Sequence, residues 1–256
     1  DKAKLYPKAK LYADYRKMLE TQKDIDAVLV ATPDHHHAAV TMMAIKMGKH
    51  VHCQKPLTHS VYEARVIGKA ACEHKVATQM GNFGQAGEGA RLIAETIWSG
   101  AIGTVREIHG GSNRIPHISP RGIARPKETP PVPEGFDWDL WLGPAPYRPY
   151  HPAYAPWTWR NWWDFGTGLF GDLGCHKLSA IFKALKLGHP TSIEASSTKY
   201  DMEKPEVYPL GVIGHFEFPA RGDMPPVTLH WYDGGLKPPR PKDLEPGRGM
   251  SGMIYV

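Results

Sequence analysis

The sequence lacks the marks of several common protein classes. Its three cysteines, Cys53, Cys72 and Cys175, are odd in number and widely spaced, which argues against a disulfide framework and against a cysteine zinc site. No stretch approaches the roughly 18 uninterrupted apolar residues of a membrane span, so we expect no membrane partner. No run of Lys or Arg concentrates the formal net charge of +5, so we expect no nucleic-acid partner.

The glycine fingerprint of a dinucleotide site, Gly-x-Gly-x-x-Gly after a strand, is absent as well. Taken alone, this absence argues against a nicotinamide enzyme. The fingerprint belongs to the first strand of such folds, however, and the chain opens at Asp1 without a methionine, so we expect that it begins after that point. For the same reason the compartment stays open between the cytoplasm and export of the folded protein to the periplasm.

Residues 24–82 alternate between apolar strands and helices. Two helices are expected between the strands. One begins at about His37 by its apolar periodicity and ends at Gly48 as its cap, and the other begins at a capping box at Ser60. Strands are expected at 24–32, 51–57 and 76–80. Apolar strands with short loops predict a parallel, right-handed α/β unit.

The pattern changes after about residue 85. Residues 115–157 are dense in proline, glycine and aromatics and predict a long ordered loop region. Helices are expected at 88–99 and 171–187, and strands at 103–113, 192–199, 210–218 and 226–232. Turn-separated strands suit an antiparallel or mixed sheet, so we divide the chain into an α/β domain at 1–84 and an α+β domain at 85–256.

Lys55 ends the expected strand at 51–57, because Pro56 removes a backbone donor and forbids further central pairing. A lysine at the carboxyl end of a strand can reach the rim where α/β sheets bind ligands. A solvated loop lysine is the alternative, and it holds for most lysines.

Asp172 and His176 share one helical face at the spacing i, i+4, so a carboxylate can orient an imidazole there. A capping aspartate beside a buried histidine fits the same spacing.

Six of the eight tryptophans lie between Trp138 and Trp163, either as an aromatic mini-core or as a platform for sugar rings. The polar groups of Arg160 and Asp164, beside Trp159, would suit sugar hydroxyls.

Five histidines close together, His35, His36, His37, His50 and His52, suggest a metal site. Adjacent histidines at a helix start point in different directions, and no carboxylate completes a ligand set, so we expect no metal. The loop after a strand's carboxyl end is a ligand position in its own right.

Three segments, Ala31–His37, Gly48–Leu57 and Gly171–His176, resemble the Gfo/Idh/MocA family of glucose–fructose oxidoreductases and inositol dehydrogenases. The similarity runs over nearly the whole chain. It implies a Rossmann-type domain, here without its first βα unit, followed by an α+β domain with an open, mostly antiparallel sheet. It also implies NAD or NADP as cofactor and a homodimer or homotetramer assembled through that open sheet.

The resemblance assigns site residues by their place in the motifs. The implied catalytic group is Lys55, Asp172 and His176. The implied cofactor contacts are Thr32, Pro33, Asp34, His37, Gln54, Lys55, Gln79 and Asn82. The implied substrate contacts are Lys55, Trp159, Arg160, Asp164, Asp172 and His176.

Three positions depart from the family pattern. Gln54 replaces the usual glutamate before Lys-Pro, as in one subgroup of the family, Asp34 stands where asparagine is common, and Ser179 stands where many relatives carry a substrate-holding aspartate. The implied function is hydride transfer between nicotinamide and a secondary hydroxyl of a sugar, glycoside or cyclic polyol. A redox-neutral, NAD-dependent glycosidase is the alternative, and a non-catalytic sugar-binding protein is the third possibility.

Overall fold

The computed structural model describes residues 2–112, 124–198, 205–247 and 252–256. The chain forms two compact units. The first contains residues 1–81 together with 132–148, and the second contains residues 82–131 together with 149–256. The sequence did not indicate that 132–148 would join the first unit.

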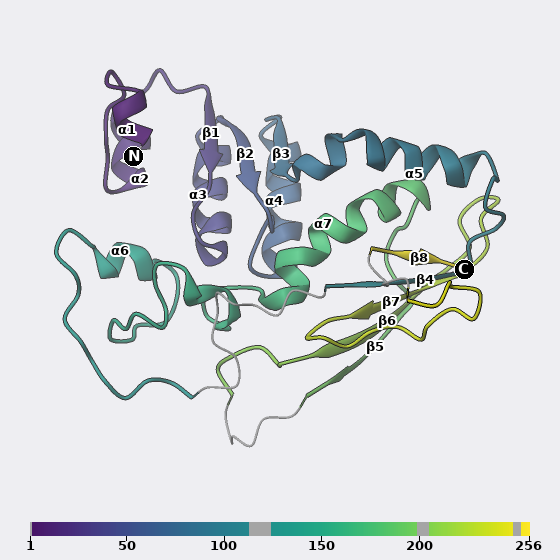
Figure 1. The fold of residues 1–256 in the computed structure, drawn as a ribbon. Helices are drawn as coiled ribbons and strands as arrows, with labels where there is room; N and C mark the ends of the chain where they lie inside the picture. The colour runs from purple at the N-terminus through teal and green to yellow at the C-terminus, as the bar shows by residue number, and fades with distance from the viewer. Residues whose placement is uncertain (1, 113–123, 199–204, 248–251) are drawn as a thin grey trace. The chain divides into compact units, whose positions relative to one another are not determined.

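The first unit is built on a parallel sheet of three strands in the order β1-β2-β3. The strands are β1 (Ala27–Val30), β2 (His50–Gln54) and β3 (Thr78–Gly81), and the connecting helices are α3 (Asp34–Lys46) and α4 (Val61–Glu73). Both helices lie on the same face of the sheet (Figure 1). This arrangement confirms the predicted parallel α/β unit. Three short helices complete it: α1 (Lys2–Leu5), α2 (Tyr15–Thr21) and α6 (Trp138–Leu142).

Local signals fix the ends of these helices. The Ser60 hydroxyl accepts from the Glu63 backbone N–H, and the Glu63 carboxylate accepts from the Ser60 N–H, so the predicted capping box is confirmed. Gly48 follows α3 with a φ of +70°, a conformation that glycine adopts without steric cost. Helix α3 begins at Asp34 rather than near His37, because Pro33 is compatible with a helix entry and an acidic first turn favours the helix dipole.

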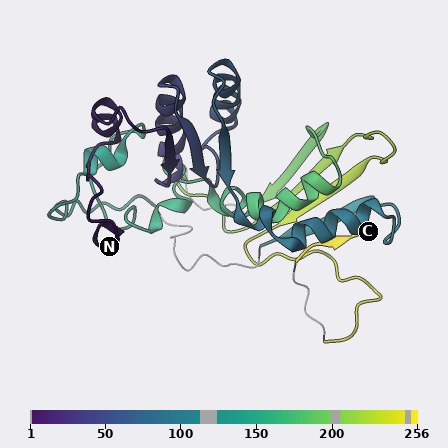
Figure 2. The same cartoon turned by 90° about the horizontal axis from the view of Figure 1, so that it is seen from above.

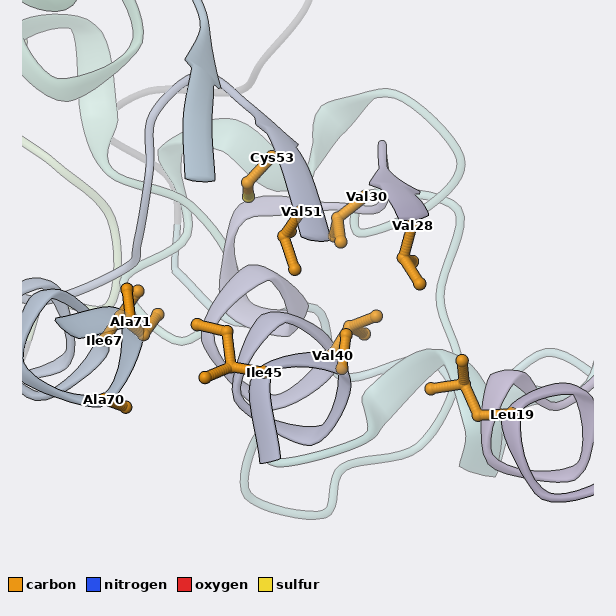
Figure 3. Packing of buried hydrophobic residues seen from close by; sticks show 11 residues of the cluster. Leu19, Val28, Val30, Val40, Ile45, Val51, Cys53, Ile67, Ala70 and Ala71 are labelled. Atoms are coloured by element: carbon orange, nitrogen blue, oxygen red, sulfur yellow. The ribbon is translucent and has the colours of Figure 1, made fainter. Parts of the chain in front are cut away.

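The core of the first unit lies between the sheet and its two helices (Figure 3). Alternate strand residues, Val28 and Val30 of β1 and Val51 of β2, point toward Val40 and Ile45 of α3. The opposite face of the sheet has no such cover among the described residues. Leu29 is 66% exposed on that face, which forms a shallow groove of about 380 Å³.

The second unit contains a mixed sheet of five strands in the order β5-β6-β7-β4-β8. The strands are β4 (Glu107–Gly111), β5 (Ser192–Ser197), β6 (Val212–Phe218), β7 (Val227–Tyr232) and β8 (Ile254–Tyr255). All neighbours pair antiparallel except β4 and β7, which are parallel. The mostly antiparallel sheet expected for the second domain is therefore confirmed.

Helices α5 (Glu88–Trp98) and α7 (Gly168–Ala184) pack side by side against one face of this sheet (Figure 2). Two single turns, η1 (Phe83–Ala86) and η2 (Thr158–Asn161), precede α5 and α7. Ile108, Leu229 and Trp231 are buried between the strands and Ile181 of α7. Because side chains alternate along a strand, their neighbours face the opposite side of the sheet.

Two expectations about the middle of the chain need correction. The predicted strand at 103–113 is shortened to β4, and residue 113 lies outside the described residues. The region expected to be one long loop, of which residues 115–123 also lie outside the described part, contains the helix α6. In the described part of the chain, no helix is both long enough and apolar enough to cross a membrane.

Candidate active site

In the first unit, the predicted cofactor residues other than Gln79 gather at the carboxyl edge of the sheet. Thr32 follows β1, Lys55 follows β2 directly, and Gly81 ends β3. The three strands are parallel and adjacent, so the loops that leave them share one edge, which is where open α/β sheets bind their ligands. Lys55 is partly buried there, and the bond between it and Pro56 is cis.

Gln54 and Gly81 are paired residues on neighbouring strands at this edge. A Cβ atom built on Gly81 would lie 2.8 Å from Oε1 of Gln54. The glycine therefore leaves room for the amide of the side chain that replaces the family's glutamate. The sequence analysis does not single out Gly81, because its partner Gln54 lies on a different strand.

His37 ties two loops of this edge together. Its side chain is 1% exposed, with Nδ1 2.7 Å from the carbonyl oxygen of Pro56 and Nε2 2.8 Å from that of Thr32. Burial lowers its pKa, against the opposing effect of the two carbonyl oxygens. Both ring nitrogens face the protein backbone, so His37 holds the loop that follows Lys55 in place.

The neighbouring histidines are directed at backbone atoms too. Nε2 of His35 and Nε2 of His36 lie 3.1 Å and 2.6 Å from the carbonyl oxygen of Trp141 in α6. These contacts attach residues 132–148 to the first unit, and burial lowers the pKa of His36. Asp34 is buried in the first turn of α3.

Gln79 is exposed in the middle of β3, opposite His52 of β2. It lines the shallow groove on the uncovered face of the first sheet. Its predicted cofactor contact would therefore have to come from that face.

In the second unit, Asn82 holds His176 in one orientation. Nδ2 of Asn82 donates to the carbonyl oxygen of Cys175 at 2.6 Å, and Oδ1 of Asn82 lies 2.9 Å from Nδ1 of His176. A carbonyl oxygen only accepts, which fixes the amide, so its Oδ1 must accept from His176. In the neutral ring, Nδ1 therefore carries the proton and Nε2 carries the lone pair.

Asp172 lies one turn before His176 on α7 and pairs with Arg160. Nε of Arg160 is 3.6 Å from Oδ1 of Asp172, and the guanidinium lies 4.3 Å from the ring centroid of Trp159. The indole, the cation and the carboxylate thus form a stack that leads from η2 to α7. The contact that the structure gives to Nδ1 of His176 comes from Asn82, and the orienting role of Asp172 stays a prediction.

The six tryptophans between Trp138 and Trp163 are divided between the two units. Trp138 and Trp141 stack on each other at 4.8 Å in the first unit, while Trp162 is fully buried beside Tyr154 in the second. Trp159 is 6% exposed and covered by Arg160. Within residues 138–163 the exposed indoles are instead those of Trp157 and Trp163, at 63% and 48%, and the partly buried Asp164 follows Trp163 in the chain. Sequence alone could not separate the buried from the exposed rings.

Two family models match the chain. Residues 2–82 match the Gfo/Idh/MocA model described as oxidoreductase family, NAD-binding Rossmann fold. Residues 122–206 match the model described as oxidoreductase family, C-terminal alpha/beta domain. The two matched segments fall in the two parts of the chain where the sequence motifs lie.

The chain is also similar in sequence to two curated proteins with named activities. The chain is 29% identical over 98 residues to levoglucosan dehydrogenase from Pseudarthrobacter phenanthrenivorans, covering 38% of this chain and 25% of that protein. It is 30% identical over 95 residues to 2,7-anhydro-N-acetylneuraminate hydratase from Mediterraneibacter gnavus, covering 37% of this chain and 25% of that protein. The chain therefore matches about a quarter of the length of each relative.

The fold also resembles that of solved structures. The WlbA dehydrogenase from Bordetella pertussis, in complex with NADH and UDP-GlcNAcA, aligns with a TM-score of 0.63 at 15% identity, covering 97% of this chain and 57% of that one. At this identity the likeness shows the fold alone. The two models of this one family together match more than half of the chain, which therefore belongs to the Gfo/Idh/MocA family of oxidoreductases.

Proposed function

We propose that the protein is an NAD(P)-dependent oxidoreductase that transfers a hydride between nicotinamide and a secondary hydroxyl of a sugar, glycoside or cyclic polyol. The observation that carries the proposal is the fixed tautomer of His176, whose Nε2 holds a lone pair because Asn82 accepts the proton of Nδ1. Family membership and the levoglucosan dehydrogenase relative support the substrate class.

The carboxyl edge of the first sheet fits a dinucleotide. Thr32, Gln54 and Lys55 supply hydrogen-bonding groups there. Gly81 has no side chain, so it leaves space for the Gln54 amide at this edge. We propose that these residues, with Pro33 and Asp34 of the same loop, hold the cofactor. When bound, a nicotinamide accepts or returns a hydride at C4.

The residues of the chain then have separate tasks. His176 takes the hydroxyl proton at Nε2, since a general base must present a lone pair within hydrogen-bond reach of its substrate. The ammonium of Lys55 is proposed to hydrogen-bond the reacting oxygen and stabilise its developing negative charge. Asp172 and Arg160, which already pair, offer acceptor and donor atoms to neighbouring hydroxyls of a polyol.

The test is a dehydrogenase assay on a panel of sugars, glycosides and cyclic polyols with NAD and NADP. We expect His176→Ala and Lys55→Ala to lose reduced-nicotinamide formation by about 100-fold or more, because a positioned acid or base contributes 10²–10⁴-fold. Both variants should still bind NADH in a fluorescence titration, His176→Ala with wild-type affinity and Lys55→Ala more weakly, because it loses one of the proposed cofactor contacts. Lys177→Ala, an exposed neighbour on α7, is the matched control. Wild-type turnover in either variant contradicts the assigned role.

A second candidate is a redox-neutral reaction by transient oxidation, elimination and re-reduction. The relative named as a hydratase favours it, because adding water to a sugar changes no net oxidation state. Activity without accumulation of reduced nicotinamide, with solvent deuterium appearing at the carbon beside the reacting one, would select this reaction. Stoichiometric formation of reduced nicotinamide would select the dehydrogenase.

We further propose that the protein self-associates through the second sheet, as a homodimer or homotetramer. Every residue of the edge strand β5 is exposed, and an open edge pairs readily with another chain. Light scattering of the purified protein gives its mass. A monomer at all concentrations contradicts the proposal.

A further inference from the structure

Three histidines form a row across the second sheet, on the face away from α5 and α7. His109 of β4 is directly opposite His230 of β7, and His230 is directly opposite His215 of β6. Their neighbours Ile108, Leu229 and Phe216 pack toward the helices. Side-chain alternation therefore sends all three imidazoles to the same outer face. The rings of His109 and His230 stack with centroids 4.5 Å apart, and those of His215 and His230 meet edge to face at 4.8 Å.

A carboxylate joins this row. Glu107 precedes His109 by two residues on β4 and shares its face, with Oε2 3.3 Å from Nε2 of His109. Single ligand atoms of Glu107, His109 and His230 all lie within 4.8 Å of one another. In the described part of the chain, this is the one group of three or more such side chains with metal-ligand spacing.

The other ring nitrogens of the two histidines already have partners. Nδ1 of His109 lies 3.3 Å from the hydroxyl oxygen of Tyr232, and Nδ1 of His230 lies 2.6 Å from Nδ1 of His215. This leaves Nε2 of each ring as the nitrogen for a ligand. Histidines that bind metal nearly always engage their second nitrogen in this way, because the outer contact fixes the tautomer and orients the ring.

We propose that Glu107, His109 and His230 bind a divalent transition-metal ion, Zn²⁺ by ligand preference, with Tyr232 and His215 as the outer hydrogen-bond partners. Two imidazole nitrogens and one carboxylate oxygen are a zinc ligand set that leaves a fourth position for water or another ligand. The site lies outside the residues assigned to hydride transfer and stands independently of that function.

The protons can be placed without contradiction. A metal takes the lone pairs of both Nε2 atoms, so Nδ1–H of His109 donates to the Tyr232 oxygen and Nδ1–H of His230 donates to Nδ1 of His215. A ligand nitrogen points at its metal in the ring plane, so binding should turn at least one of the two stacked rings.

The test is titration of the chelator-treated protein with Zn²⁺ alone, competed against a colorimetric zinc indicator, without substrate or cofactor. We expect one high-affinity ion per chain. Loss of an outer partner typically weakens metal binding by about 10- to 100-fold, and His215→Gln should fall within that range. His109→Gln and His230→Gln, which each remove a ligand, should weaken binding by more than that. His189→Gln, at an exposed histidine outside the row, is the matched control.

Two further measurements keep the result unambiguous. Thermal unfolding of each metal-free variant shows whether the fold persists, so that loss of structure is not mistaken for loss of a ligand. Titration with Co²⁺ should give the visible absorption of a four-coordinate ion in wild type and none in the His109→Gln, His230→Gln double variant. The proposal is overturned if wild type and the folded double variant take up zinc equally. It is also overturned if the protein binds zinc no more tightly than free histidine does in the same indicator competition.

Discussion

Removal of the Asn82 amide should leave His176 in place but without the hydrogen bond that orients its ring. Asn82 is 9% exposed and makes two hydrogen bonds, one to the Cys175 carbonyl and one to the imidazole. Each is worth about 0.5–1.5 kcal/mol net, so Asn82→Ala should lower the free energy of unfolding by about 1–3 kcal/mol. For a unit of this size that is about 2–12 °C in Tm. Differential scanning calorimetry measures this loss.

The same substitution should also lower catalytic activity. Without Asn82, His176 loses the acceptor that keeps its proton on Nδ1, so kcat/KM should fall by at least about 10-fold and by no more than the roughly 10²–10⁴-fold that a positioned base supplies in all. Asn82→Asp should behave differently: a carboxylate favours the imidazolium and raises the pKa of His176, so the acid limb of the pH profile should move to higher pH. An unchanged pH profile in Asn82→Asp, with wild-type kcat/KM in Asn82→Ala, would refute the reasoning.

Four further predictions concern the first unit. Gly81→Ala should displace the Gln54 side chain, since the new Cβ meets Oε1 at 2.8 Å, and should weaken NADH binding in a fluorescence titration with little change in Tm. His37→Leu removes the imidazole that lies between the Thr32 and Pro56 carbonyls. A neutral ring donates to only one of them, so the loss should cost about 1–3 kcal/mol in urea unfolding. Ser60→Ala removes the N-terminal cap of α4 and should cost about 1 kcal/mol by the same method. The control Ser99→Ala, at the C-terminal cap of α5 in the second unit, should cost less. Because burial lowers the pKa of His36 and His37, the unfolded chain binds protons first as pH falls, so the stability of this unit should be full above about pH 6.5 and decline below it.

Local features of the fold could be predicted from the sequence because neighbouring residues decide them. The capping box at Ser60, the cap at Gly48 and the apolar alternation of β1 and β2 all act within a few residues. The start of α3 was misplaced by three residues, because histidines in a first turn are weak helix formers and their contacts with the Trp141 carbonyl come from residues more than 100 positions away.

The candidate site could be predicted in part. The motifs predict roles for Lys55, Asp172 and His176, but the contact between Asn82 and His176 joins residues 94 apart and carries no local pattern. The same holds for the histidine row, since His109, His215 and His230 meet only through the register of three strands. Whether a tryptophan is buried, as Trp159 is, or exposed, as Trp157 is, depends on packing that composition does not encode.

Hydride transfer is tested most directly by isotope. The protein is incubated with NAD⁺ and a polyol that carries deuterium on its hydroxyl-bearing carbons, and the cofactor is analysed by mass spectrometry. We predict that deuterium appears in the reduced nicotinamide with wild type and disappears with His176→Ala, while both proteins bind NADH equally. Product formed from the polyol with no deuterium in the nicotinamide would contradict the account.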